Sequence, residues 1–86
     1  MALSKYTILV ADYIPTDMML LKIQLNRLHS RLLFATDGFE VLRQVEKKCP
    51  DLILMDLYMP GISGFEVADV LAQQEYTRKI PIIYIV

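Results

Sequence analysis

Two short apolar segments of the chain end in the same way, and this repeat constrains the fold more than any other feature. Residues 6–11 form a continuous run of apolar and β-branched side chains that stops at Asp12. Residues 52–55 form a second apolar run, which stops at Asp56. Strands without polar alternation are typical of parallel sheets that are covered on both faces. The sequence therefore predicts two buried parallel strands, each followed or ended by an acid.

Segments of helical and strand character alternate along the chain. A first helix of about four turns is expected from Pro15, a residue that suits the first helical position. Apolar residues recur there at spacings of three and four, at Met18, Leu21, Leu25 and Leu28. Pro50 ends the second helix. The remaining elements are expected as strands over 31–35, 51–56 and 80–86 and as helices over 39–48 and 65–74.

The alternation of strands and helices predicts an α/β fold. A β-α-β-α-β-α-β order implies a parallel sheet with right-handed crossovers and with helices on both faces. At 86 residues, without an internal repeat or a linker, the chain is expected to form one domain over residues 1–86.

Composition excludes several function classes. Nine Lys plus Arg against ten Asp plus Glu leave a net charge of -1, and no basic stripe indicates nucleic-acid binding. The apolar runs are shorter than the ~18 residues of a membrane span. With no secretory signal at the start of the chain, a cytoplasmic location is expected. Cys49 is the only cysteine, which excludes an internal disulfide and a thiolate metal site.

The two strand-end acids, Asp12 and Asp56, are the first candidates for a functional site. Ligands of open parallel sheets bind beyond the carboxyl ends of the strands. If the two strands are neighbours, about 4.8 Å apart, the carboxylates converge on one pocket. Two close carboxylates favour a hard cation such as Mg²⁺. The alternative is that each acid only caps a turn or the following helix.

A long segment around Asp56 resembles a known family. Residues 50–66 are similar to the phosphoacceptor strand and loop of response-regulator receiver domains. Further similarities lie at residues 8–12, 35–38 and 80–83, so that the resemblance touches nearly the whole chain. It implies a flavodoxin-like three-layer sandwich with the strand order 2-1-3-4-5. This chain would hold four strands and three helices of that fold, as a C-terminally truncated domain without the fifth strand and the last helices.

The resemblance also implies roles for individual residues. Asp56 would accept a phosphoryl group from a histidine kinase or a phosphotransfer domain. Asp12 would hold Mg²⁺ together with Asp56 and the backbone carbonyl of Tyr58. Pro60 and Gly64 would shape the loop after the acceptor. By this comparison the chain is a phosphoacceptor or a pseudo-receiver and not an enzyme.

Three positions depart from the family pattern. Tyr13 stands where the family usually has a second acid, and a phenol with a pKa near 10 is a poor Mg²⁺ ligand. Val86 stands where the family has the Thr or Ser that contacts the phosphoryl group. The lysine of the family's fifth strand has no counterpart, because the chain stops before such a strand. We therefore expect slow, unstable or absent phosphorylation.

Three function classes follow from these residues. The first hypothesis is a switchless receiver-like module that acts through protein–protein contacts. The second is a working phosphoacceptor on Asp56, and the third is a small-ligand binder on a flavodoxin-like fold. The sequence contains no glycine-rich phosphate-binding loop, so it gives no support to nucleotide binding. The fourth strand is expected to be an exposed apolar edge, which predicts self-association.

Overall fold

Four parallel strands form a single sheet in the computed structural model, which describes residues 5–85. The sheet order is β2-β1-β3-β4. The strand bounds are Thr7–Ala11 for β1, Arg31–Ala35 for β2, Leu52–Asp56 for β3 and Ile82–Ile85 for β4. This order is that of the first four strands of a flavodoxin-like sheet, which confirms the expected fold class.

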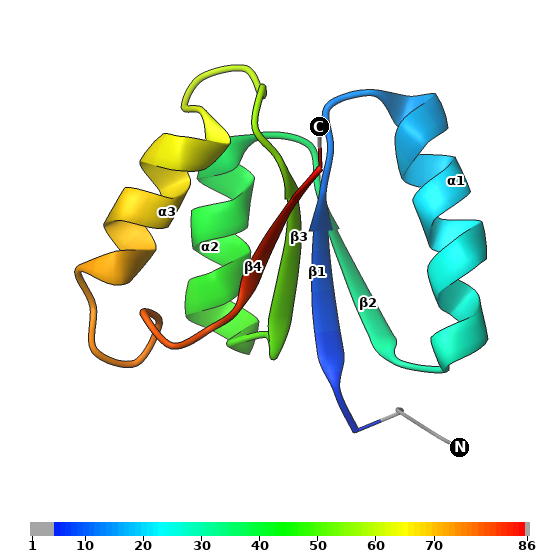
Figure 1. Ribbon diagram of the computed structural model, residues 1–86, viewed down its shortest axis with the longest axis horizontal. Helices are drawn as coiled ribbons and strands as arrows, with labels where there is room; N and C mark the ends of the chain where they lie inside the picture. Colours follow the sequence, from blue (N-terminus) through cyan, green and yellow to red (C-terminus); the bar gives the residue numbers. More distant parts are fainter. Residues whose placement is uncertain (1–4, 86) are drawn as a thin grey trace.

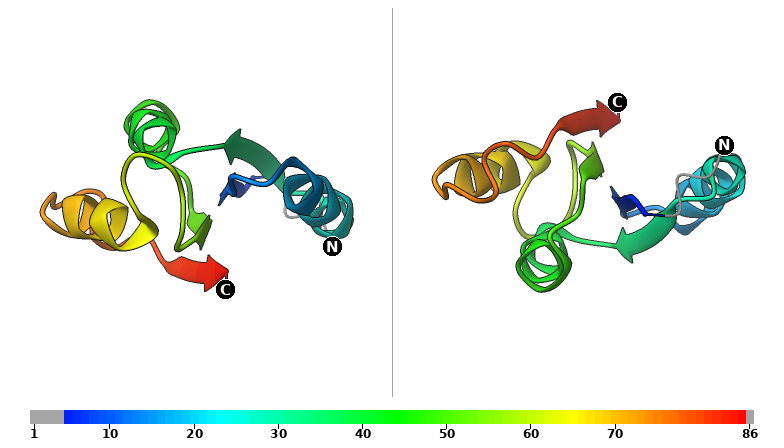
Figure 2. Two further views of the ribbon diagram at one scale, coloured as in Figure 1. Left: turned by 90° about the horizontal axis from the view of Figure 1, so that it is seen from above. Right: turned by 90° about the horizontal axis from the view of Figure 1, so that it is seen from below.

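Helices cover both faces of this sheet, so the fold has three layers. Helix α1 (Pro15–Leu25) lies on one face, and α2 (Gly38–Lys48) and α3 (Gly64–Ala72) lie on the other (Figure 1). Figure 2 shows the sheet end-on between these layers, with α1 beside β1 and β2. None of the described helices is long and apolar enough to cross a membrane.

The packed core lies between the sheet and the α2/α3 layer. Alternate residues of the central strands point into it, and they meet one side of each of these helices. The buried members are Leu9, Ala11, Ala35, Val41, Val45, Ile53, Met55, Met59, Val67 and Leu71. The apolar runs of β1 and β3 therefore supply the core directly, as their composition indicates.

Helix α1 differs from its prediction in length and in packing. The α-helix ends at Leu25, and a 3-10 turn (Asn26–Leu28) follows it. His29 then takes the left-handed conformation, with φ 57°. Met18, Leu21 and Leu25 are the half-buried residues of α1, which confirms this part of the predicted stripe, whereas Leu28 lies beyond the α-helix and is exposed. No residue of α1 is fully buried, and Met19, Leu20 and Ile23 are exposed apolar residues, so the helix is less amphipathic than predicted.

Side chains cap the starts of α2 and α3. Asp37 Oδ1 accepts a hydrogen bond from the backbone N–H of Glu40 at 2.8 Å. Ser63 and Glu66 form a reciprocal capping box at the start of α3, with hydrogen bonds of 3.2 and 2.9 Å. These caps satisfy backbone donors that have no partner within a helix.

Strand β4 is shorter than the predicted 80–86 segment. Ile80 still belongs to a turn, because its N–H donates to the carbonyl of Thr77 at 3.0 Å. Pro81 has no N–H, but its carbonyl accepts from Ile53 at 3.0 Å and begins the pairing with β3. Val86 lies outside the described residues.

Candidate functional site

The Asp12 carboxylate lies directly after β1 and is nearly inaccessible, with the residue 2% exposed. Its Oδ1 accepts a hydrogen bond from the backbone N–H of Ile14 at 3.0 Å. Ile14 is the N-cap of α1 and makes no side-chain cap. Asp12 therefore stabilises the turn that leads into the helix, which is the alternative that the sequence left open. The same side chain also lies at the carboxyl edge of the sheet.

Asp56 is the last residue of β3 and repeats this local geometry. Its Oδ1 accepts a hydrogen bond from the backbone N–H of Tyr58 at 2.9 Å. Because Ala11 pairs with Met55, the next residues, Asp12 and Asp56, are neighbours across β1 and β3. The structure thus brings the two aspartates together. One carboxylate oxygen of each accepts a hydrogen bond from a backbone N–H of the loop that follows it.

Burial raises the pKa of the Asp12 carboxyl above its usual range. The hydrogen bond from the N–H of Ile14 opposes this effect, because it favours the ionised form. The nearby carboxylates of Asp56 and Asp17, and a side-chain hydrogen bond with Asp56, raise the pKa further. A cation beside the Asp12 carboxylate would oppose this effect and favour its ionised form.

This pair of strand-end aspartates lies within a segment that matches a known family. The family described as response regulator receiver domain matches residues 8–86. The chain belongs to this family.

Relatives of this receiver domain occur inside much longer proteins. It is 43% identical over 76 residues to the sensor protein EvgS of Escherichia coli (strain K12). That match covers 88% of this chain and 6% of EvgS. The receiver domain thus spans a small part of this relative's length.

Solved receiver domains share the arrangement of the strands and helices. The N-terminal domain of a response regulator receiver protein from Methanoculleus marisnigri JR1 has a TM-score of 0.89 at 32% identity. The receiver domain of the sensor histidine kinase PA1611 from Pseudomonas aeruginosa PAO1 has a TM-score of 0.89 at 28% identity, and its active site cleft coordinates a magnesium ion. Each match covers 94% of this chain and 66% of the other.

The oxygen donors of this receiver domain fit Mg²⁺. Asp12 and Asp56 offer carboxylates, and the backbone carbonyl of Tyr58 is two residues beyond the second of them. Within residues 5–85 no group of three or more His, Cys, Asp or Glu side chains could hold a metal. Mg²⁺ keeps several waters and is often held by one or two carboxylates, so this smaller donor set is compatible with the chemistry of the ion.

Tyr13, which departs from the family pattern, directly follows Asp12 in the chain. The Tyr13 side chain is 57% exposed. Tyr58 is 78% exposed, which leaves only its backbone near the predicted site. The altered switch position, Val86, is outside the described residues, so its role stays a prediction.

The structure adds a contact at Asp17 and one at Gly64, and the sequence predicted only that Gly64 shapes the loop after Asp56. Asp17, in the first turn of α1, shares with Asp12 a shallow pocket of about 220 Å³ whose other lining residues are Leu20, Leu21, Gln24 and Ile85. The first-turn position of Asp17 was the available signal. Gly64 lies against the backbone of Asp56, where an added Cβ would come within 2.6 Å of its carbonyl oxygen. No local sequence pattern indicates such a contact.

Proposed function

We propose that this receiver domain acts in two-component signalling mainly through protein–protein interaction, with phosphorylation of Asp56 slow, short-lived or absent. The observation that carries this proposal is the exposed phenol of Tyr13 at the position next to Asp12. A second carboxylate there would add a negatively charged oxygen ligand to the cation site, whereas the tyrosine side chain supplies no carboxylate. The partners would be a histidine kinase or a phosphotransfer domain.

A working phosphoacceptor is the second candidate, and the paired geometry of Asp12 and Asp56 favours it. An Asp56 oxygen would attack the phosphorus of a phosphohistidine, forming an O–P bond as the N–P bond breaks. Asp12, Asp56 and the Tyr58 carbonyl would hold Mg²⁺, which supplies positive charge to the phosphoryl oxygens. The N–H of Tyr58 already donates to Asp56 Oδ1, and it fixes the orientation of the nucleophile.

One experiment separates these two candidates. The ¹⁵N-labelled domain is treated with Mg²⁺ and beryllofluoride, and separately with acetyl phosphate, and is followed by NMR and intact mass. The interaction proposal expects little or no change at the amides around Asp56. A saturable change that Asp56→Asn abolishes would establish the phosphoacceptor instead. A typical receiver domain in the same buffer serves as the positive control.

We further propose that β4 mediates self-association. β4 is the end strand beside β3 in the described sheet, and unpaired strand edges favour pairing with another chain. Ile83 supports this proposal, because it is an apolar strand residue that is 54% exposed. Light scattering over a range of concentrations tests this, and a clean monomer at high concentration would contradict it.

A further inference from the structure

The outer edge of β2 offers unpaired backbone groups. Arg31 donates its N–H to the Tyr6 carbonyl at 2.8 Å, and the Ala35 carbonyl accepts from Asp12 at 3.1 Å. Successive residues of a parallel strand bond to opposite sides. The backbone groups of Leu32 and Phe34 therefore point away from β1, where the described sheet has no further strand.

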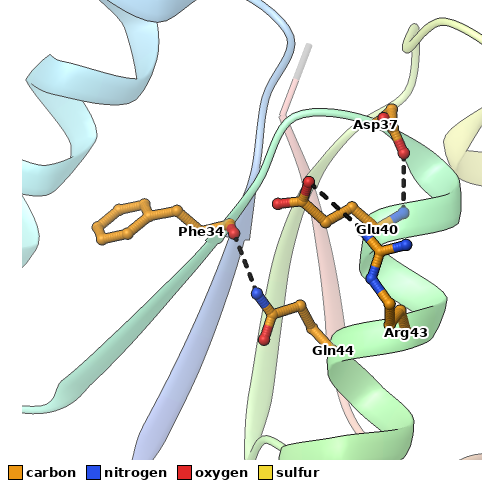
Figure 3. A network of polar contacts seen from close by, with 5 residues as sticks. All are labelled: Phe34, Asp37, Glu40, Arg43 and Gln44. Atoms are coloured by element: carbon orange, nitrogen blue, oxygen red, sulfur yellow. Dashed lines mark hydrogen bonds and ion pairs between the residues drawn. The ribbon is translucent and has the colours of Figure 1, made fainter.

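One of these outward groups has a weak partner on α2. The Gln44 side-chain amide donates to the Phe34 carbonyl at 3.5 Å, as Figure 3 shows. This distance is at the long end for a hydrogen bond. The contact also confirms that the Phe34 carbonyl points outward. A strand that pairs with β2 would replace it at little cost.

A hollow of about 530 Å³ lies beside this edge, on the α1 side. Leu32 and Phe34 line it from β2, and Ser30 lies just before the strand. Its other lining residues come from α1 and the following turn and are Lys22, Ile23 and Asn26. The Lys22 ammonium is 5.7 Å from the centre of the Phe34 ring. The Ser30 hydroxyl oxygen is buried and has no hydrogen-bond partner in the described part of the chain.

The charge of this region is positive. Lys22 is the charged residue that lines the hollow, and two exposed arginines lie nearby in the chain, Arg27 in the turn after α1 and Arg31 at the start of β2. Within residues 5–85 the ion pair found is Arg43 with Glu40, on α2. Lys22 therefore has no carboxylate partner among these residues, and an incoming carboxylate would be complementary to it.

We propose that the outer edge of β2 and this hollow bind an extended acidic peptide segment of another protein, which adds to the sheet as a strand. Backbone hydrogen bonds to Leu32 and Phe34 would supply the pairing, and alternate side chains of the peptide would face α1. A carboxylate beside Phe34 would meet Lys22. An apolar side chain two positions along would lie against Ile23 and Leu32. This surface is separate from the aspartate pair and does not depend on phosphorylation.

The test uses a short, terminally blocked, threonine-rich peptide that carries a glutamate and a valine two positions apart. A matched peptide has lysine in place of the glutamate. In NMR titrations of the ¹⁵N-labelled domain, the glutamate peptide should shift the amides of Leu32 and Phe34 and slow their hydrogen exchange. It should bind about fivefold more tightly than the lysine peptide, the upper range for an exposed ion pair.

Charge-reversal variants complete the test. Lys22→Glu should reverse the preference between the two peptides, while Lys79→Glu, at another exposed lysine, should preserve it. Lys22→Gln, which should abolish the preference, replaces the first variant if that one fails to fold. Equal binding of both peptides, or shifts centred on β4, would overturn the proposal. Leu32 signals that move with protein concentration alone would also overturn it, because a second copy would then occupy the edge.

Discussion

Gly64, the first residue of α3, lies so close to Asp56 that a Cβ on it would approach the Asp56 carbonyl oxygen to 2.6 Å and the Leu57 Cα to 3.1 Å. The N–H of Gly64 also donates to the Leu57 carbonyl at 2.9 Å. The loop after Asp56 therefore returns onto the end of its own strand. This return is possible because position 64 has no side chain.

Gly64→Ala is expected to destabilise the domain by about 2 kcal/mol, because a methyl group would overlap rigid backbone. Urea denaturation measures the change in the free energy of unfolding. Ala72→Ser, at the exposed end of the same helix, is the control and should change this free energy by no more than about 0.5 kcal/mol. A Gly64→Ala domain as stable as the control would contradict the contact.

The pKa of Asp12 predicts how stability depends on pH. Its folded-state pKa is raised by burial, so above the unfolded value of about 3.9 the folded state binds more protons than the unfolded state. Stability is therefore lost as pH rises from that value through the folded pKa. Asp12→Asn removes this loss and keeps an acceptor for the N–H of Ile14. The variant should be at least as stable as the parent at pH 7.

Denaturation at a series of pH values, in the presence of EDTA, tests this expectation. The variant should show a flatter dependence of the unfolding free energy on pH above about 4. Asp17→Asn is the comparison, since it removes a neighbouring charge and leaves the buried carboxyl in place. An Asp12→Asn variant with the parent's pH profile would show that burial of Asp12 has no energetic effect.

Tyr13→Asp should strengthen Mg²⁺ binding. The side chain at this position is exposed, so the fold should tolerate the change. One more carboxylate beside Asp12 should raise the affinity about tenfold, since ligand charge sets affinity for hard cations. Isothermal titration calorimetry measures the affinity, with Ile14→Asp as the neighbouring control. An unchanged affinity would show that the side chain at position 13 does not contribute to Mg²⁺ binding.

Ile83→Lys should weaken self-association through β4. A lysine on an edge strand opposes pairing with another chain. Met19→Lys changes an apolar residue of similar exposure on α1, 61% against 54%, and should leave the association unchanged. Light scattering at matched concentrations measures the association of both variants. Equal loss in both would assign the association to general surface apolarity.

The strands could be predicted from the sequence because burial and composition coincide there. The apolar runs before Asp12 and Asp56 formed β1 and β3 within one residue of the expected bounds. The packing of α1 was harder to predict, because apolar residues lie on several sides of this helix. The left-handed conformation of His29 also depends on the path of the chain into β2, and no sequence pattern predicts that path.

The candidate site was partly predictable for a similar physical reason. Parallel pairing brings strand ends together, so the proximity of Asp12 and Asp56 follows from sheet order. The hydrogen bonds from Ile14 and Tyr58 to the two carboxylates could not be foreseen, since they depend on loop conformation. The capping box at Ser63 was readable from the Ser-x-x-Glu pattern, but no prediction used it.

The unequal packing of the two sheet faces has a consequence for motion. α2 and α3 each bury several residues in the core, whereas α1 buries none. Segments with few buried contacts open at a lower free energy than the rest of a domain. The amide protons of α1 should therefore exchange with solvent through local opening, well before those of β1 and β3. The two aspartates would then lie at the boundary between a slowly exchanging half of the domain and a quickly exchanging one.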